Sequence, residues 1–340
     1  MNLQEQISRM KSMMGGLNES EEQLLDKKNP EDELVEKYWS DETKTEDEKL
    51  EEVKNYLLPI FEETKKYYFT YIEGDWFTKK IEEKIKLSIK KFPFNLINKT
   101  ESGYKKITTW GTEEKKQLKD FINNLSLEYV LKCNKKQMAF INPNFPESIN
   151  FCVKTIYPSQ DKSFPYQVIL HEMKHSINQY FMDRGVNILP KDANQKLITF
   201  KNSSYEKSSN ENSSRVQNLR MLLGVDDLVS VENFIKLLKE NLVIKNENLE
   251  PPVDCVIEYN NNEMVINTEI PSKEKNNSSL NYLYFYFGGQ KNQDIKRLFN
   301  NFTTLDKTGD KLKLKINLQS LFNYSQEFAK IDTKGDNNYA

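Results

Sequence analysis

Apolar residues recur at helical spacing along much of the chain. The strongest pattern lies between Tyr166 and Asp183, where apolar residues cover most of the helix circumference and Gly185 marks the end. Five more helices are predicted on the same basis, over residues 50–61, 81–89, 112–131, 210–223 and 231–242. The middle of the chain is therefore predicted to be mainly helical.

Runs rich in β-branched and aromatic residues predict several short strands. Two of them, Lys136–Ile141 and Ser148–Tyr157, precede the helix that begins at Tyr166. After the pair Pro251 and Pro252 the pattern predicts a hairpin of 255–259 with 264–270, strands at 282–287 and 311–318, and a helix at 294–302. The predicted fold class is α+β, with a small C-terminal α+β unit.

The N-terminal segment has a different pattern. Residues 2–17 carry apolar residues at alternating spacings of four and three, which predicts an amphipathic helix suited to a partner helix. Residues 18–48 are acidic and polar, and are predicted to be a linker with one marginal helix. These patterns divide the chain into an N-terminal part (1–45), a main domain (46–250) and the C-terminal unit (251–340).

Charge and composition exclude several classes of partner. The net charge is −2, so nothing draws the whole protein to nucleic acid or to an anionic membrane. We assign the aromatic strand at 282–287 to the core, and nucleic-acid binding is not proposed. No apolar run approaches 18 residues, so no membrane span is predicted. The N-terminus lacks a basic segment followed by an apolar one, which predicts cytoplasmic synthesis without a signal peptide.

The three cysteines, Cys133, Cys152 and Cys255, are odd in number and far apart, with no C-x-x-C pair. This spacing argues against a disulfide framework and against a zinc site with cysteine ligands. We expect all three to be buried as small apolar side chains.

Both histidines of the chain, His171 and His175, lie in one H-E-x-x-H run within the predicted helix 166–183. Residues four apart share a helix face, so both imidazoles can reach one metal ion, with Glu172 beside them as a base. Random placement of two histidines would produce this run roughly once in two thousand chains, a composition estimate for weighing such a motif. The motif predicts hydrolytic zinc chemistry, in which zinc lowers the pKa of a bound water.

A third zinc ligand must be a carboxylate or a cysteine, because the chain has no other histidine. Glu206 and Glu211 are the nearest candidates, whereas Asp183 lies near the helix end at the wrong angle. Glu211 is preferred because it opens the predicted helix 210–223 and is held there rigidly. Arg215, one turn later, is placed to pair with a carboxylate and fix its orientation.

Residues 136–223 resemble the zincin metallopeptidases, and among them the gluzincins, whose third ligand is a glutamate. The resemblance implies a mixed sheet with an active-site helix, with zinc held by His171, His175 and Glu211. It also implies peptide hydrolysis with Glu172 as general base, and strand addition of a peptide or protein substrate to an edge strand, here Ser148–Tyr157. Lys174 departs from the family pattern and is expected to face solvent or a carboxylate, leaving the helix partly exposed.

Other interpretations stay open. The helix 210–223 and the segment 1–19 are also similar to proteins of tailed bacteriophages, which implies a final location in the host cytoplasm or the virion. In that case the chain could be a virion or assembly protein that keeps a zincin fold for binding rather than catalysis. A third interpretation is that the two histidines share an ordinary helix by coincidence. Donors for an oxyanion are sought among Tyr157, Tyr166, Arg184 and Tyr205.

Overall fold

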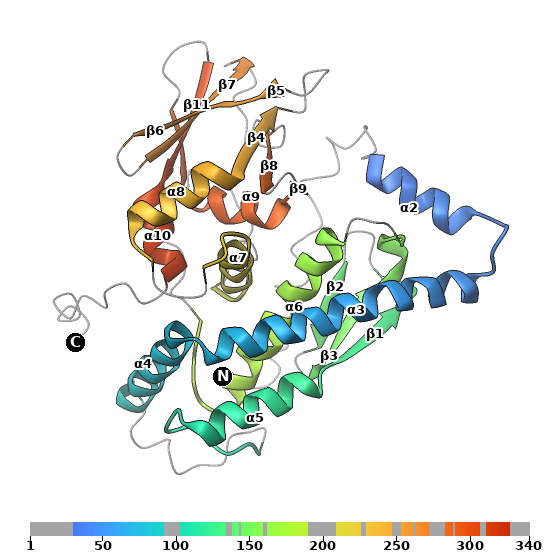
Figure 1. The fold of residues 1–340 in the computed structure, drawn as a ribbon, viewed down its shortest axis with the longest axis vertical. Helices are drawn as coiled ribbons and strands as arrows, with labels where there is room; N and C mark the ends of the chain where they lie inside the picture. The colour runs from blue at the N-terminus through green and yellow to red at the C-terminus, as the bar shows by residue number, and fades with distance from the viewer. Residues whose placement is uncertain are drawn as a thin grey trace, which may run out of the picture. The chain divides into compact units, whose positions relative to one another are not determined.

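The computed structural model describes residues 30–91, 103–133, 138–142, 144–158, 162–189, 209–225, 229–246, 253–260, 263–271, 283–287, 290–306 and 311–326 (Figure 1). The predicted helix at 2–17 lies outside these residues. The described residues fall into two compact units, one ending at Leu189 and one beginning at Ser209. The mixture of helices with small sheets in both units confirms the predicted α+β class.

The first unit contains the helices α2 (Pro30–Ser40), α3 (Glu46–Glu73), α4 (Asp75–Lys91), α5 (Thr112–Asn123) and α6 (Ser163–Asp183). Helix α3 begins with a capping box, in which Thr45 and Glu48 each accept a hydrogen bond from the other's backbone amide. The predicted helix at 50–61 is therefore longer at both ends. It continues through Pro59 because buried residues recur at helical spacing as far as Ile72.

The sheet of the first unit has three strands, β1 (Ser126–Val130), β2 (Ala139–Asn142) and β3 (Phe145–Cys152), in the order β1-β3-β2. Strand β3 runs parallel to β1 and antiparallel to β2, so the sheet is mixed. Two predictions are wrong here. The helix predicted at 112–131 ends at Asn123, because the following residues pair with β3 as β1. The strand predicted at Ser148–Tyr157 is central rather than an edge, and a short 3-10 helix, η1 (Val153–Thr155), follows it.

The prediction for the cysteines is wrong for two of the three. Cys133 and Cys152 form a disulfide across 19 residues of sequence, and Cys255 is a free thiol. The cause is the parallel pairing of β1 with β3, which places Val130 beside Cys152 and brings Cys133 back to it. Sequence spacing did not reveal this contact because strand pairing creates it.

Part of the predicted acidic linker is an ordered helix. The indole Nε1 of Trp39, in α2, donates a hydrogen bond to the carbonyl oxygen of Ile156 at 2.9 Å. The Lys154 ammonium lies 5.7 Å from the centroid of the Trp39 ring and also pairs with Glu46. Helix α2 is therefore fixed to the segment that leads from β3 into α6.

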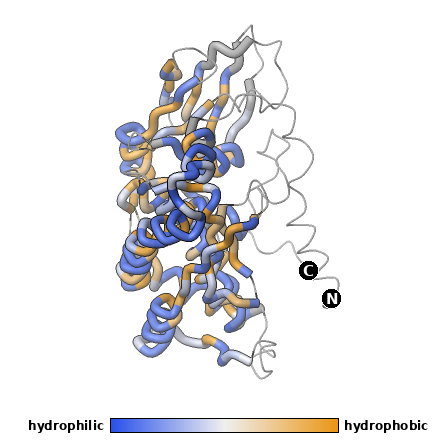
Figure 2. The backbone as a smooth tube through the Cα atoms, turned by 90° about the vertical axis from the view of Figure 1, so that its right-hand side faces the viewer, coloured by the Kyte–Doolittle hydropathy of each residue, from blue (hydrophilic) through white to orange (hydrophobic). Residues whose placement is uncertain are grey.

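Helix α6 forms the centre of the first unit. It contacts β2 and β3 of the sheet and also helix α3. Hydrophilic and hydrophobic residues are interspersed along the described chain (Figure 2), and in α6 most of the circumference is buried, as predicted. Rings pack against its C-terminal half: Phe77 of α4 and Trp110 contact Phe181, and Phe121 of α5 contacts Tyr180.

The second unit contains the helices α7 (Ser209–Leu222), α8 (Val231–Asn241), α9 (Gln293–Asn300) and α10 (Leu318–Gln326). Its strands are β4 (Leu242–Asn246), β5 (Val253–Asp254), β6 (Val256–Asn260), β7 (Glu263–Pro271), β8 (Leu283–Phe287), β9 (Gln290–Lys291), β10 (Thr303–Asp306) and β11 (Lys311–Asn317). They form two antiparallel sheets, β10-β11-β7-β6 and β5-β4-β8-β9.

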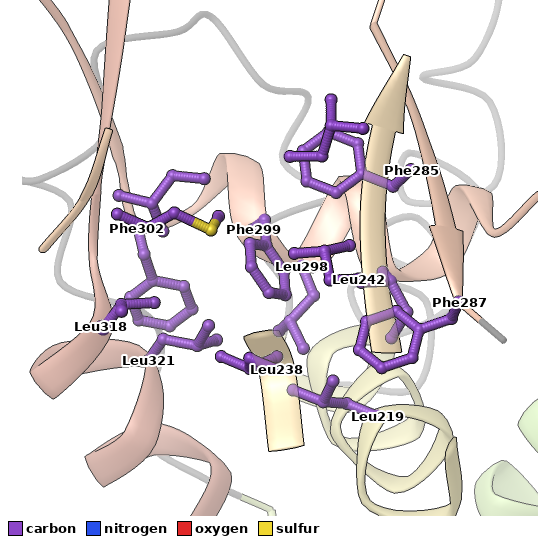
Figure 3. Packing of buried hydrophobic residues seen from close by; sticks show 14 of the residues in the cluster. Leu219, Leu238, Leu242, Phe285, Phe287, Leu298, Phe299, Phe302, Leu318 and Leu321 are labelled. Atoms are coloured by element: carbon purple, nitrogen blue, oxygen red, sulfur yellow. The ribbon is translucent and has the colours of Figure 1, made fainter. Parts of the chain in front are cut away.

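The second unit confirms the predicted hairpin, since β6 pairs with β7 from Tyr259 opposite Met264 onward. Strand β4, by contrast, was missed, because it follows α8 without a turn. It pairs with β8, so a single sheet crosses the predicted boundary at residue 250. One apolar core joins both sheets to the helices (Figure 3), including Leu219, Leu238, Phe285, Leu298 and Phe299.

Helices α7 and α9 lie side by side in the second unit. The Asn212 Oδ1 accepts a hydrogen bond from Nδ2 of Asn301, which follows α9, at 2.9 Å. Near the other end, Asn218 Nδ2 donates to Oδ2 of Asp294, in the first turn of α9, at 2.8 Å. Asn212, early in α7, thus pairs with Asn301 after the end of α9, whereas Asn218, later in α7, pairs with Asp294 at the start of α9. The two helices therefore run antiparallel, with a hydrogen bond near each end.

Candidate metal centre

The two histidines of the H-E-x-x-H run lie on one face of α6, as their spacing of four predicts. His171 is buried and His175 is half-buried. Their Nε2 atoms are 3.0 Å apart, and the ring planes make an angle of 78°. The same nitrogen of both rings therefore lies on the side where the two rings meet.

A carboxylate accompanies the two imidazoles. One ring nitrogen of His171, one of His175 and one carboxylate oxygen of Glu211 all lie within 4.8 Å of one another. Glu211 stands in the first turn of α7 and is only 6% exposed. The structure thus brings three of the predicted site residues together in a group that could hold a metal ion. The assignment of Glu211 as the third ligand itself stays a prediction.

The geometry of the histidine pair fits a tetrahedral ion. Two nitrogens at roughly 2.0–2.1 Å from a tetrahedral zinc lie about 3.3 Å apart. The observed 3.0 Å between the Nε2 atoms is close to that value. Two neutral imidazoles and one carboxylate are also a donor set that zinc takes in hydrolytic enzymes, where a fourth position stays open for water.

Glu211 is held within its own helix by Arg215. The Nη2 atom of Arg215 lies 3.8 Å from Oε2 of Glu211, one turn away, and both side chains are buried. The guanidinium also donates from Nη1 to Oδ1 of Asn212 at 3.3 Å. Arg215 therefore pairs with a carboxylate as predicted, and its role in fixing the orientation of Glu211 stays a prediction.

Glu172 follows His171 in the same turn of α6 and is half-buried. The alternative ligand Glu206 and the oxyanion candidate Tyr205 lie outside the described residues.

Lys174 does not face solvent, so that part of its prediction is wrong. The side chain is 1% exposed, and its ammonium lies 5.7 Å from the ring centroid of Tyr71 on α3. The tyrosines of α3 cover this side of α6, which is why a lysine in the motif did not leave the helix exposed there. Lysine stems are long enough to be buried along apolar surfaces in this way.

The described candidates for an oxyanion donor differ in their surroundings. Arg184 caps the C-terminus of α6 and packs on the rings of Tyr180 and Tyr104, at 3.6 and 4.3 Å from their centroids. It lies nine residues past His175, about 13 Å along the helix, which removes it from consideration. Burial raises the pKa of Tyr166 to about 12, with a further contribution from Glu63, so its hydroxyl remains a donor at neutral pH. Tyr157 packs against Tyr38.

One contact next to the motif was missed from the sequence. The hydroxyl of Tyr68, on α3, donates a hydrogen bond to the carbonyl oxygen of Leu170 at 3.0 Å. Burial raises the pKa of Tyr68 well above 10, so the hydroxyl keeps its proton. The bond holds α6 at the residue before His171. The spacing of Tyr68 and Tyr71 along α3 indicated a buried helix face, but nothing in the sequence indicated its partner.

Comparison of the chain with models of known protein families, with curated proteins and with solved structures gave no match. Within the part of the chain that the structure describes, no helix has both the length and the apolar character needed to cross a bilayer. The function of the protein is therefore inferred from the site itself.

Proposed function

We propose that this protein is a zinc-dependent metallopeptidase. The observation that carries the proposal is the group of His171, His175 and Glu211, with ligand atoms within 4.8 Å of one another and Glu172 adjacent on α6. Zinc is favoured among divalent cations because imidazole and carboxylate donors in a set of three suit its tetrahedral geometry.

The division of roles follows from the chemistry of each side chain. Zinc, when bound, lowers the pKa of a coordinated water to about 7 and polarises a carbonyl group. Glu172 is the group that accepts the proton of the attacking water, since its carboxylate is next to a ligand without being required as one. Tyr166, which keeps its hydroxyl proton, and Tyr157 are the described candidates for donating a hydrogen bond to the developing oxyanion.

The substrate is proposed to add to the sheet of the first unit along β2. Within the described residues β2 pairs only with β3, so its other edge presents backbone donors and acceptors. It also contacts α6, which carries the histidines. An extended peptide can pair with such an edge. The central position of β3 excludes the strand that the sequence suggested for this role.

The decisive experiment is Glu172→Gln in the full chain. We expect the variant to bind zinc as wild type does and to lose cleavage of an unfolded, fluorescently labelled protein by at least about 100-fold, the lower range for removal of a general base. Zinc content is measured by elemental analysis and cleavage by fluorescence.

The matched control is Asp183→Asn, which neutralises a carboxylate in the last turn of the same helix. It should keep both zinc and cleavage. Full cleavage by Glu172→Gln would disprove the mechanism. Zinc binding by wild type without any cleavage would instead favour the alternative, a protein that uses this fold for binding in a virion or its assembly.

A further inference from the structure

Helix α7 buries an unusual series of polar side chains around Glu211. Asn212, Arg215 and Asn301 are each at most 1% exposed. They form a connected series, in which Asn301 donates to Asn212, Arg215 donates to the same oxygen of Asn212, and Arg215 pairs with Glu211. The series leads from the residue after α9 to the carboxylate expected to bind zinc.

The orientation of the Asn212 amide follows from its neighbours. Both groups that approach it, the guanidinium of Arg215 and the Nδ2 of Asn301, are donors. The atom between them must therefore be the oxygen, which accepts both bonds. The direction of both hydrogen bonds to Asn212 is therefore fixed.

We propose that Asn212 and Asn301 are positioning residues for the metal centre. They fix the guanidinium of Arg215, and Arg215 in turn fixes the carboxylate of Glu211 for zinc. The inference rests on the proposed function, because it takes Glu211 as a ligand.

The physical reason lies in the position of Glu211. A glutamate in a first helical turn has three side-chain torsions, and ordering them costs entropy each time a metal binds. A buried guanidinium that Asn212 already holds, with Asn212 held in turn by Asn301, orders the carboxylate before binding. Removing hydrogen-bond partners of metal ligands typically weakens metal affinity by 10- to 100-fold.

The test measures zinc affinity by competition with a chelating dye in the full-length chain. Arg215→Ala should weaken zinc binding roughly 10- to 100-fold, and Asn212→Ala and Asn301→Ala should weaken it in the same direction. Arg215→Lys keeps the charge but loses the fork that reaches two partners, so it should also bind zinc more weakly. This variant serves if an alanine variant fails to fold.

Asn218→Ala is the matched control. Asn218 is also a buried asparagine of α7 with a hydrogen bond to α9, of 2.8 Å, but that bond goes to Asp294 rather than to Arg215 or Glu211. Its loss should destabilise the fold and leave zinc affinity unchanged. In a second comparison, adding Asn301→Ala to Arg215→Ala should cause no further loss of affinity, because Asn301 acts through Arg215.

Two outcomes separate this inference from the proposed function. If wild type binds zinc and Asn301→Ala binds it as tightly as Asn218→Ala does, the positioning role is overturned while the metal centre stands. If wild type binds no zinc, the metal centre and the positioning role fail together.

Discussion

The two helices that carry the candidate ligands are built in opposite ways. Helix α6 buries more apolar side chains, such as Ile169, Leu170, Met173 and Ile177, than polar ones, which are Gln167, His171, Lys174, Ser176 and Asn178. Helix α7 is almost completely buried from Glu211 to Arg220, yet most of the side chains there are polar: Glu211, Asn212, Ser213, Ser214, Arg215, Gln217, Asn218 and Arg220.

This difference in buried side chains means that the two helices require different surroundings. Apolar burial is favourable in itself and tolerates many neighbours. A buried polar side chain costs free energy unless a specific partner satisfies it. Helix α7 therefore depends on the partners that Asn301 and Asp294 provide, and we propose that the same contacts orient Glu211. Helix α6 carries the two histidines on an ordinary core helix.

The largest effect is expected when one candidate ligand is removed from each helix. His175→Ala and Glu211→Ala should each weaken zinc binding by more than the roughly 100-fold that loss of a ligand's partner costs. If both helices supply ligands, each of the two variants loses zinc affinity in this way. The measurement is zinc affinity by dye competition, with the fold checked by circular dichroism.

The control in this experiment is Glu206→Ala, which removes the alternative carboxylate. It should bind zinc as tightly as wild type. If Glu206→Ala loses zinc and Glu211→Ala keeps it, the third ligand has been assigned to the wrong glutamate, and the comparison between α6 and α7 loses its functional basis.

Both ligand helices could be predicted from the sequence. Helix α6 begins three residues before the predicted start and ends at the predicted Asp183, and α7 is shifted by one residue at each end. Glycines in the left-handed region, Gly185 at φ +80° and Gly224 at φ +62°, follow them as predicted. The bounds of a long helix with periodic apolar residues and a terminal glycine can be predicted from the local sequence, because they do not depend on residues far away in the chain.

The remaining features depend on contacts far apart in sequence. Strand β1 has five residues and becomes a strand through pairing with β3, and the disulfide follows from the same pairing. The burial of Lys174 depends on the tyrosines of α3, and that of α7 on α9. None of these partners can be identified from local periodicity, which explains why they were missed.

The next largest effect is expected on the free energy of unfolding, when the disulfide beside the sheet that α6 contacts is removed. Cys133→Ser opens a loop of 19 residues beside the sheet that α6 contacts, and should lower the free energy of unfolding by about 3 kcal/mol. The loss should appear in urea unfolding without reductant and vanish when wild type is also reduced. Cys255→Ser, at the free and half-buried thiol, is the control and should have little effect.

A thiol count checks the same prediction directly. Unfolded, unreduced wild type should react at one cysteine of its three. Reaction at all three would mean that the sheet beside α6 is held by strand pairing alone.

A smaller test compares one hydrogen bond at each helix. Tyr68→Phe removes the bond to the carbonyl of Leu170, which keeps its partner within α6, and should cost about 1 kcal/mol of unfolding free energy. Asn218→Ala removes a donor from the Asp294 carboxylate, and should cost about 1–3 kcal/mol. Urea unfolding of both variants measures the difference. Equal costs would show that the polar interior of α7 depends on its partners no more than α6 does.

The smallest effect concerns the charge at the end of α6. Burial raises the pKa of Asp183 above its ordinary value, in spite of a 2.7 Å hydrogen bond from Gln179. The folded protein thus binds this proton more tightly than the unfolded chain, so stability falls as pH rises through the folded pKa. Asp183→Asn removes that fall. We expect the variant to be more stable than wild type at pH about 7 and equal to it at pH about 3.

Glu232, in the first turn of α8, tests the sign of this argument. Its own backbone amide and the Ser230 hydroxyl lower the pKa of its carboxyl, so its ionised form stabilises the fold above the ordinary pKa and that stability is lost as pH falls. Glu232→Gln should therefore be less stable than wild type at pH about 7, the opposite of Asp183→Asn. Both variants remove one negative charge. A shift in the same direction for both would mean that net charge, rather than the burial of the α6 terminus, sets the pH dependence.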